Sequence, residues 1–303
     1  MFRFPVLVFT IGCLGALYLR AADSHSGRTF KTSSVTLYYE TLGSAQGTPL
    51  VVANGGPGFD HTYMHLSDVW DRIAKNRRVI MYDQRGVGKS SALETGQSCT
   101  LQDQIEDLEA VRAQIGSERI DLLGHSWGGY LVMAYAARYP QHIQHLLIVD
   151  SAAPKISDTV FLFKDVFPEG VEREDTEEFA RQMGDKSAAG KTLREYFSML
   201  FCSPEKRDAA LAKMAEVGEN RTVNETIWHD LERFDLNPEL AKYRFPTLVI
   251  TGRFDMNVAP VVAYKIHKAI PGSQFVVFDR SGHIPFYEEP DKFQQTVETF
   301  LAR

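Results

Sequence analysis

The hydrophobic residues of the chain form two alternating patterns. Short continuous runs of apolar and β-branched residues recur between more polar stretches, at Val35–Glu40, Pro49–Ala53, Arg78–Tyr82, Ile120–Leu123, His145–Val149, Thr247–Thr251 and Gln274–Phe278. Runs that are apolar at successive positions, rather than at every second one, are typical of strands buried on both faces of a parallel sheet. The pattern therefore predicts a mostly parallel sheet built from these segments.

Segments with helical periodicity lie between these predicted strands. In Leu101–Ile115 the apolar residues follow a helical spacing, and Thr100 can cap the helix with Asp103 three residues further on. A second helix is expected over Trp127–Tyr139, where Pro140 closes it. This alternation of strands and helices predicts an α/β fold with a mostly parallel, doubly wound sheet.

The alternation stops between residues 152 and 245. Here the sequence is more charged and lacks the strand pattern, but amphipathic helical spacing occurs at Glu172–Met183, Leu193–Leu200 and Pro204–Val217. The strand pattern resumes at Pro246. A helical block between two strands has the layout of a cap over a functional site. We therefore predict a core of residues 23–151 and 246–303, with a helical cap at 152–245.

The first residues differ from the rest of the chain. Arg3 precedes an almost wholly apolar stretch, Pro5–Leu19, and two small residues follow at Ala21 and Ala22. This order is typical of a secretory signal peptide, and the apolar stretch is shorter than the ~20 residues that span a bilayer. We therefore expect residues 1–22 to be a signal peptide that exports the chain to the periplasm or the medium. The alternative is an uncleaved N-terminal membrane anchor.

Composition and charge narrow the range of partners. The 303 residues carry a formal net charge of -6, and the basic residues are scattered, which argues against a nucleic-acid surface. After cleavage two cysteines remain, Cys99 and Cys202. We expect them to be separate thiols, although an oxidising compartment would permit a disulfide. Nothing in the sequence resembles a metal-binding cluster of Cys or His residues, so neither a metal nor an organic cofactor is expected.

A short glycine-containing motif indicates the chemistry. Residues Gly124–Gly128 read Gly-His-Ser-Trp-Gly, directly after a predicted strand and directly before a predicted helix. This arrangement is typical of a nucleophile elbow, in which a tight turn exposes the serine hydroxyl, here that of Ser126. The helix N-terminus behind the serine favours negative charge that develops during a reaction. The side chain of His125 is expected to point beneath the elbow and to serve as packing.

A serine hydroxyl needs a base that a third group orients. With a nucleophile elbow, the expected order along the chain is serine, acid, histidine. Asp255 and His283 each follow the end of a predicted strand, so both are expected beside Ser126 at the carboxyl edge of the sheet. Asp150 also follows a strand and is the alternative acid. Asp279 lies too close to the histidine in sequence to reach it from a separate loop.

A second glycine-rich segment, Asn54–Gly58, follows the predicted strand at Pro49–Ala53. Acyl transfer creates an oxyanion that needs preorganised N–H donors. One donor is expected from Trp127, directly after the serine. The other is expected from Gly56, with Gly55 as the second choice, because glycine allows the backbone to approach a substrate closely.

These motifs resemble those of the proline iminopeptidase family of α/β-hydrolases, over roughly residues 30–303. Asn54–Gly58 resembles the family's His-Gly-Gly-Pro-Gly oxyanion loop, with asparagine in place of the histidine. Tyr82–Ser90 is similar to its Asp-Gln-Arg-Gly-x-Gly-x-Ser segment, and Gly124–Gly129 matches its elbow, tryptophan included. The predicted acid and base also stand where the family has them.

The resemblance implies a serine hydrolase that releases N-terminal proline or other small residues from short peptides through an acyl-enzyme. It also implies a cap carboxylate that binds the α-ammonium group of the substrate. Glu225 and Glu205 are the first candidates and Glu232 is a third, while Trp127 is a further substrate contact. The alternatives are a carboxylesterase or lactonase on the same fold, and a ligand-binding homologue without catalysis. The expected partner is thus a small peptide or ester substrate.

Overall fold

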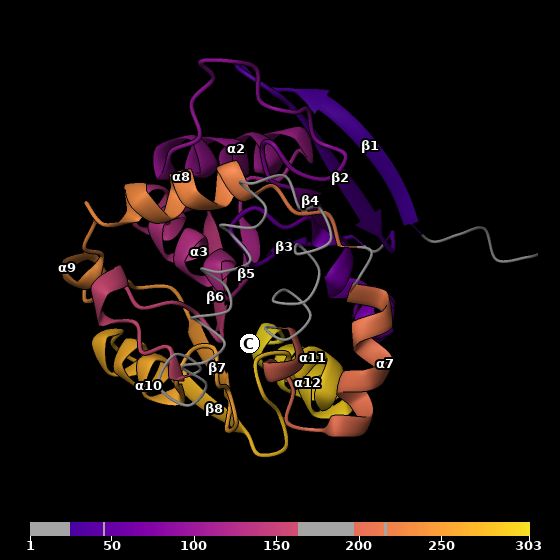
Figure 1. Ribbon diagram of the computed structural model, residues 1–303, viewed down its shortest axis with the longest axis vertical. Coiled ribbons are helices and arrows are strands. Elements are labelled where there is room, and N and C mark those ends of the chain that lie inside the picture. The colour runs from indigo at the N-terminus through magenta and orange to yellow at the C-terminus, as the bar shows by residue number, and fades with distance from the viewer. Residues whose placement is uncertain (1–24, 45, 163–196, 215–216) are drawn as a thin grey trace, which may run out of the picture.

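A single sheet forms the centre of the protein (Figure 1). The computed structural model describes residues 25–44, 46–162, 197–214 and 217–303. Within them an eight-stranded sheet has the order β1-β2-β4-β3-β5-β6-β7-β8. The strands are β1 His25–Lys31, β2 Thr36–Leu42, β3 Leu50–Ala53, β4 Val79–Asp83, β5 Ile120–His125, β6 Ile143–Val149, β7 Thr247–Gly252 and β8 Gln274–Phe278.

The directions of the strands confirm the predicted fold class. β1 and β2 pair antiparallel, as do β2 and β4, and all the other neighbouring pairs are parallel. Every residue of β3, β5 and β7 is buried, as their continuous apolar runs predicted. β1 was not predicted, because its sequence is polar and its described side chains are mostly exposed. It is an edge strand that pairs with β2 alone.

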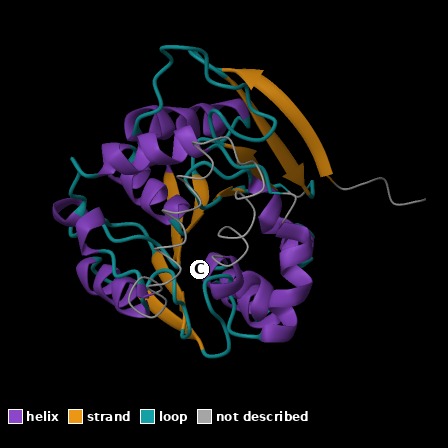
Figure 2. Cartoon of the chain, viewed as in Figure 1, coloured by secondary structure: helices purple, strands orange, loops and turns teal. Residues whose placement is uncertain are grey.

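Helices cover both faces of this sheet (Figures 1 and 2). Within the described ranges they are η1 His61–Leu66, α1 Val69–Ile73, α2 Leu101–Gln114, α3 Trp127–Arg138, η2 Pro140–His142, η3 Ile156–Asp158, α7 Pro204–Met214, α8 Arg221–Leu231, α9 Asn237–Leu240, α10 Pro260–Ala269, α11 Pro285–Glu288 and α12 Pro290–Leu301. The predicted cap of α2 is confirmed, because Thr100 and Asp103 form a reciprocal capping box.

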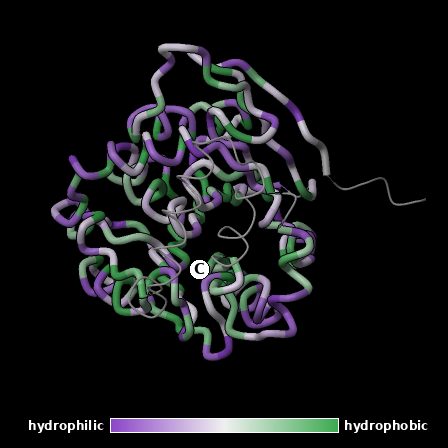
Figure 3. Tube along the Cα trace, in the orientation of Figure 1, coloured by the Kyte–Doolittle hydropathy of each residue, from purple (hydrophilic) through white to green (hydrophobic). Residues whose placement is uncertain are grey.

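The two faces of the sheet bury separate hydrophobic clusters. Val51 of β3 belongs to the cluster that includes residues of α2, α3, α8 and α10, whereas its neighbours Leu50 and Val52 belong to the one that includes residues of α1, α7 and α12. This alternation follows from the opposite directions of successive side chains in a strand. Figure 3 shows hydrophobic stretches in the interior and hydrophilic ones along the outer loops.

The described residues between β6 and β7 are mainly helical, as the sequence predicted. α7 begins at the expected Pro204 and is described as far as Met214, and α8 and α9 were not predicted. The predicted helix at Glu172–Met183, part of that at Leu193–Leu200, and the predicted signal peptide lie outside the described residues. The division into core and cap stays a prediction.

Two further expectations concern cysteines and membranes. Cys99 is buried, Cys202 is half-buried, and the two are separate thiols, as expected. Across the described ranges, no helix combines the length and the hydrophobicity that a membrane span requires.

Candidate active site

Ser126 occupies a strained turn between β5 and α3. Its φ is 58°, in the left-handed region that costs a non-glycine residue energy. The turn packs tightly because glycines flank it. A Cβ atom added to Gly124 would lie 2.1 Å from the carbonyl oxygen of Gly128, and one added to Gly128 would lie 2.2 Å from that of Ala53. The elbow motif thus lets α3 approach β3 closely while the serine stands at the carboxyl end of the sheet.

Asp255 and His283 follow β7 and β8 and meet at the same edge. The Nδ1 of His283 lies 2.7 Å from Oδ2 of Asp255, and both side chains are buried. The other oxygen of Asp255 accepts hydrogen bonds from the backbone N–H groups of Asn257 and Val258, at 2.8 and 2.9 Å. The carboxylate is therefore held in place and accepts a hydrogen bond from the Nδ1–H of His283. The lone pair of the ring is then on Nε2, the nitrogen that can act as a base.

Ser126 and His283 line one pocket, whose further lining comes from the oxyanion loop, η1 and the cap. Ser126 makes no hydrogen bond to the ring in the described structure. The Nε2 atom of His283 lies instead 3.2 Å from Nδ2 of Asn257. Loose contact between nucleophile and base is common before substrate binds. Asn257 was not anticipated from the sequence. The one sequence feature that could have indicated it is its position two residues after the predicted acid.

The oxyanion loop is held by hydrogen bonds from its own asparagine. Asn54 Nδ2 donates to the carbonyl oxygen of Phe59 at 2.8 Å, so asparagine supports this loop without the histidine of the resembled family. The N–H of Gly55 donates to the hydroxyl of Tyr63 at 2.5 Å. That N–H is therefore engaged, whereas Gly56 lines the pocket with φ at 129°. The geometry favours Gly56 over Gly55 as the predicted donor.

A buried chain of hydrogen bonds joins the oxyanion loop to the loop after β8 that carries His283, here called the histidine loop. The Tyr63 hydroxyl lies 2.7 Å from Nδ1 of His125, and Nε2 of His125 lies 2.7 Å from the carbonyl oxygen of His283. Burial, and then the neighbouring His283, lowers the pKa of His125 well below its usual value, so the ring is neutral. The Gly55 N–H then donates to the Tyr63 hydroxyl, the Tyr63 hydroxyl donates to Nδ1 of His125, and the Nε2–H of His125 donates to the carbonyl oxygen of His283. The packing role expected for His125 was therefore incomplete, and no sequence signal indicated Tyr63.

The Asp-Gln-Arg-Gly segment, residues 83–86, supports the same carboxyl edge of the sheet through hydrogen bonds of Gln84. Gln84 donates from Nε2 to the carbonyl oxygen of Asn54 at 3.0 Å and accepts from the indole N–H of Trp127 at 2.8 Å. The indole of Trp127 is buried, and its N–H is hydrogen-bonded to Gln84. It does not line the pocket. The structure therefore does not support the expected substrate contact by this side chain. The backbone N–H of Trp127 begins α3, where N–H groups have no partner within a helix.

Asp150, the alternative acid, lies beside the predicted one. Its Oδ1 accepts a hydrogen bond from the N–H of Gly252 at 2.8 Å, while its buried Oδ2 has no partner among the described residues. One carboxylate oxygen of Asp150, one of Asp255 and one ring nitrogen of His283 lie within 4.8 Å of one another. Burial, and then the charge of Asp255, raises the pKa of Asp150 well above its usual value. Because ionisation of two adjacent buried carboxylates is unfavourable, Asp150 is held in its neutral form beside Asp255.

The structure does not bring the three predicted cap glutamates to the pocket. Glu225 pairs with Arg221 at 2.7 Å on an exposed face of α8, and Glu232 is exposed near His229. Glu205 is exposed in the first turn of α7. None of the three lines the described pocket, whose cap contribution is apolar, from Phe197, Leu200, Met214 and Val217. Their position on exposed helix faces makes them surface charges in the described structure, and nothing here supports their predicted contact with a substrate amine.

The fold and this edge of the sheet define the class of the protein. The family model of the alpha/beta hydrolase fold matches residues 48–290, so the chain belongs to that family. A similar solved structure is an alpha/beta fold family hydrolase from Bacillus anthracis, with a TM-score of 0.75 and 22% identity over 91% of this chain and 99% of that one. An esterase from Exiguobacterium antarcticum has a TM-score of 0.69 and 25% identity over 89% and 96% of the two chains.

Similarity to curated relatives identifies a narrower family within the alpha/beta hydrolases. A proline iminopeptidase from Saccharolobus solfataricus is 32% identical over 291 residues, which cover 87% of each chain. One from Clostridium botulinum is 29% identical and covers 88% of this chain and 94% of its own. Within the alpha/beta hydrolases, the chain belongs to the proline iminopeptidase family, as its motifs predicted.

Proposed function

We propose that this chain is a serine aminopeptidase that releases N-terminal proline or other small residues from short peptides. The observation that carries the proposal is the 2.7 Å pairing of His283 with Asp255 in a pocket that Ser126 also lines. The similarity to proline iminopeptidases over 87% of the chain supports the substrate class. No step of this chemistry requires a metal or an organic cofactor.

The proposed mechanism is an acyl transfer. The Oγ of Ser126 attacks the carbonyl carbon of the substrate while Nε2 of His283 takes its proton, and Asp255 stabilises the imidazolium that forms. The backbone N–H groups of Gly56 and Trp127 stabilise the oxyanion. His283 then donates the proton to the leaving amine, and water hydrolyses the acyl-enzyme by the same steps. For this to proceed, His283 must exchange its contact with Asn257 for one with Ser126.

The pocket also favours a second candidate, a carboxylesterase or lactonase. The described lining is apolar around Ser126 and contains no carboxylate, although a substrate ammonium group needs an anion. Solved structures with this fold include the esterase above and an enol-lactonase from Burkholderia xenovorans, with a TM-score of 0.71 and 21% identity. An ester substrate needs no ammonium site, so the two candidates differ in whether a free amino group matters. A homologue that binds a ligand without catalysis would turn over neither type of substrate.

A panel of chromogenic substrates tests the proposal. We expect turnover of prolyl or alanyl anilides with a free amino group, and we expect N-acylation of the same substrates to reduce kcat/KM at least tenfold. Ser126→Ala should abolish turnover and labelling by a fluorophosphonate probe. Equal turnover of free and acylated substrates would replace the aminopeptidase by the esterase. Full labelling of the Ser126→Ala variant would remove the assigned nucleophile.

We also propose that residues 1–22 direct export of the chain. The support is their sequence pattern alone: a cation, an apolar stretch and small residues.

A further inference from the structure

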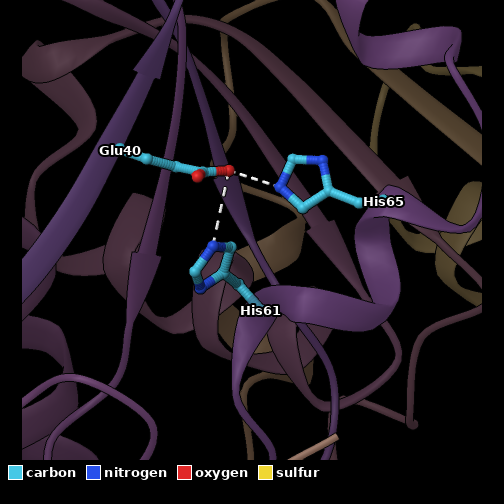
Figure 4. Close-up of side chains that lie close together, drawn as sticks. All are labelled: Glu40, His61 and His65. Carbon is cyan, nitrogen blue, oxygen red and sulfur yellow. Dashed lines mark hydrogen bonds and ion pairs between the residues drawn. The ribbon is translucent and has the colours of Figure 1, made fainter. Parts of the chain in front are cut away.

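Three side chains of the types that bind metals meet outside the Ser126 pocket (Figure 4). Glu40 comes from β2, and His61 and His65 come from η1. One potential ligand atom of each lies within 4.8 Å of the other two. Oε1 of Glu40 is 3.4 Å from Nε2 of His61 and also contacts Nε2 of His65. Figure 4 shows both rings directed toward this carboxylate oxygen.

A second carboxylate orients the buried ring. Nδ1 of His61 lies 2.6 Å from Oδ1 of Asp83, and Asp83 also accepts hydrogen bonds from the backbone N–H groups of His61 and Lys89, at 3.1 and 2.7 Å. A proton on Nδ1 is therefore held by Asp83, and the ring is oriented so that Nε2 faces Glu40. Histidines that bind metals almost always donate their other N–H to a carboxylate or carbonyl in this way.

We propose that Glu40, His61 and His65 form a binding site for a divalent transition-metal ion of the zinc type. Two imidazole nitrogens and one carboxylate oxygen suit Zn²⁺, whereas Mg²⁺ and Ca²⁺ prefer oxygen ligands throughout. The 3.4 Å separation between Glu40 Oε1 and His61 Nε2 matches the edge of a tetrahedron with bonds of about 2.0–2.1 Å. Nε2 of His65 contacts the same carboxylate oxygen directly, so this ring would have to move away from Glu40 to admit the ion. The side chain of His65 is 26% exposed, which gives the ion a route from solvent and leaves room for water as a fourth ligand.

A proton is the competing occupant of the same site. Burial lowers the pKa of His61, but hydrogen bonds to Asp83 and Glu40 outweigh it and raise the pKa to about 9. The proton and the ion are attracted by the same two carboxylates. A bound Zn²⁺ would balance both negative charges, whereas the proton balances one.

The proposed ion would tie η1 to the sheet. η1 also carries Tyr63, whose hydroxyl contacts the Gly55 N–H and His125. A metal at the two histidines of this short helix would fix the side chain that supports the oxyanion loop. This consequence rests on the proposed function, whereas metal binding itself does not.

Zinc binding to the purified, tag-free full chain tests the site. After treatment with EDTA and dialysis, titration with Zn²⁺ against a chromophoric chelator should show one ion per chain with micromolar or tighter affinity, and Mg²⁺ should not compete. His65→Ala should weaken binding at least tenfold and, because this side chain is partly exposed, should leave the fold intact. Asp83→Asn should weaken it about 10- to 100-fold, as loss of such an orienting carboxylate does. Co²⁺ should give the visible absorption of a four-coordinate site.

His229→Ala is the matched control, since the side chain of His229 is 75% exposed on α8. It should bind zinc as the unaltered chain does. Equal affinity of the His65→Ala and His229→Ala variants would overturn the proposal. So would less than one zinc per chain at ten micromolar free zinc, because the cluster would then be a proton-bridged ion pair alone. Both results concern binding, so they are independent of whether the enzyme cleaves peptides.

Discussion

The protonation of Asp150 is the feature on which the candidate acid-base pair depends most. Asp150 and Asp255 are both buried within reach of the His283 ring, but the hydrogen bond to Nδ1 belongs to Asp255. A neutral Asp150 leaves one negative charge next to the histidine, which is what an imidazolium needs. Motif order placed Asp255 in this role. It could not show the proton on Asp150, because that proton follows from the mutual proximity of two strand ends.

Asp150→Asn keeps this side chain neutral at every pH and so tests its protonation. The pKa of Asp150 is raised in the folded state, so the fold holds a proton that the unfolded chain releases above a pH of about 4. The stabilisation is full below that pH and is lost as the pH rises toward the folded-state pKa. Relative to the unaltered chain, the variant should therefore gain free energy of unfolding between pH 4.5 and pH 8, as measured by urea denaturation.

The same variant separates the two candidate acids by activity. Asp150→Asn should retain most of kcat, whereas Asp255→Asn should lose about 10⁴-fold, because the ring then takes the wrong tautomer. Asp158→Asn, at an exposed position, is the control and should show no pH-dependent change in stability relative to the unaltered chain. Loss of activity in Asp150→Asn with retention in Asp255→Asn would exchange the two roles.

Tyr63 acts on the oxyanion loop through Gly55. Tyr63→Phe removes the acceptor for the Gly55 N–H and the donor to His125. Because Tyr63 positions the loop and does not itself contact the oxyanion, we expect kcat to fall about tenfold, less than the ~100-fold or more for loss of an oxyanion donor. KM should stay unchanged, which distinguishes misplacement of the loop from general loosening of the pocket.

Tyr130→Phe is the matched control for this hydroxyl. The Tyr130 hydroxyl is buried and has no hydrogen-bond partner within the described ranges. Its removal should leave kcat and KM as they are. A kcat in Tyr63→Phe equal to that of Tyr130→Phe would mean that the hydrogen-bond chain does not position the oxyanion loop.

At the scale of elements, one glutamate joins the cap to the histidine loop. Glu288 of α11 accepts from the backbone N–H groups of Cys202 and Ser203 through Oε1, both at 2.9 Å, and from that of Gly282 through Oε2 at 2.6 Å. The N–H of His283 in turn donates to the carbonyl oxygen of Leu200 at 2.7 Å. The start of α7 and the loop after β8 are therefore coupled through one carboxylate.

Glu288→Gln should break this coupling. Its Oε1 can still accept from Cys202 and Ser203, but its Nε2 then faces the Gly282 N–H, so one buried donor loses its acceptor. We expect the free energy of unfolding to fall by about 1–3 kcal/mol in urea denaturation. Asp291→Asn alters an exposed ion pair with Arg72 and should change it by less than about 0.5 kcal/mol. Equal values for the two variants would contradict the coupling.

The elements that the sequence predicted share a strong local signal. The buried strands are continuous apolar runs, and β8 has the predicted bounds of Gln274–Phe278. β1 was missed because an edge strand with a polar sequence is stabilised by pairing with β2, not by its own burial. α8 was missed although Val223, Ile227 and Leu231 are buried at helical spacing, since polar residues, charged or uncharged, make up most of the rest of it.

For the whole molecule, predictability depends on how the residues are brought together. The motifs before α3 and after β7 and β8 lie at the carboxyl edge, because parallel strands bring their carboxyl ends to one edge. The Glu40, His61 and His65 cluster was not found. The two histidines have a spacing that suits a pair of metal ligands, but Glu40 comes from a separate strand, and no local pattern joins it to them. The cap glutamates were placed by resemblance alone, without a local pattern that links their positions to the pocket.

Export of the whole molecule is testable through its N-terminus. β1 begins at His25, after the predicted signal segment of residues 1–22, so removal of about 22 residues leaves the described fold complete. When the full chain is expressed in a bacterial host, mass spectrometry should find a mature N-terminus close to Ala22 in the extracytoplasmic fraction. Leu14→Arg, which interrupts the apolar stretch, should keep the chain full-length in the cytoplasm. A full-length chain in the membrane fraction would establish the anchor instead, and an intact Met1 in the cytoplasm would end the export proposal.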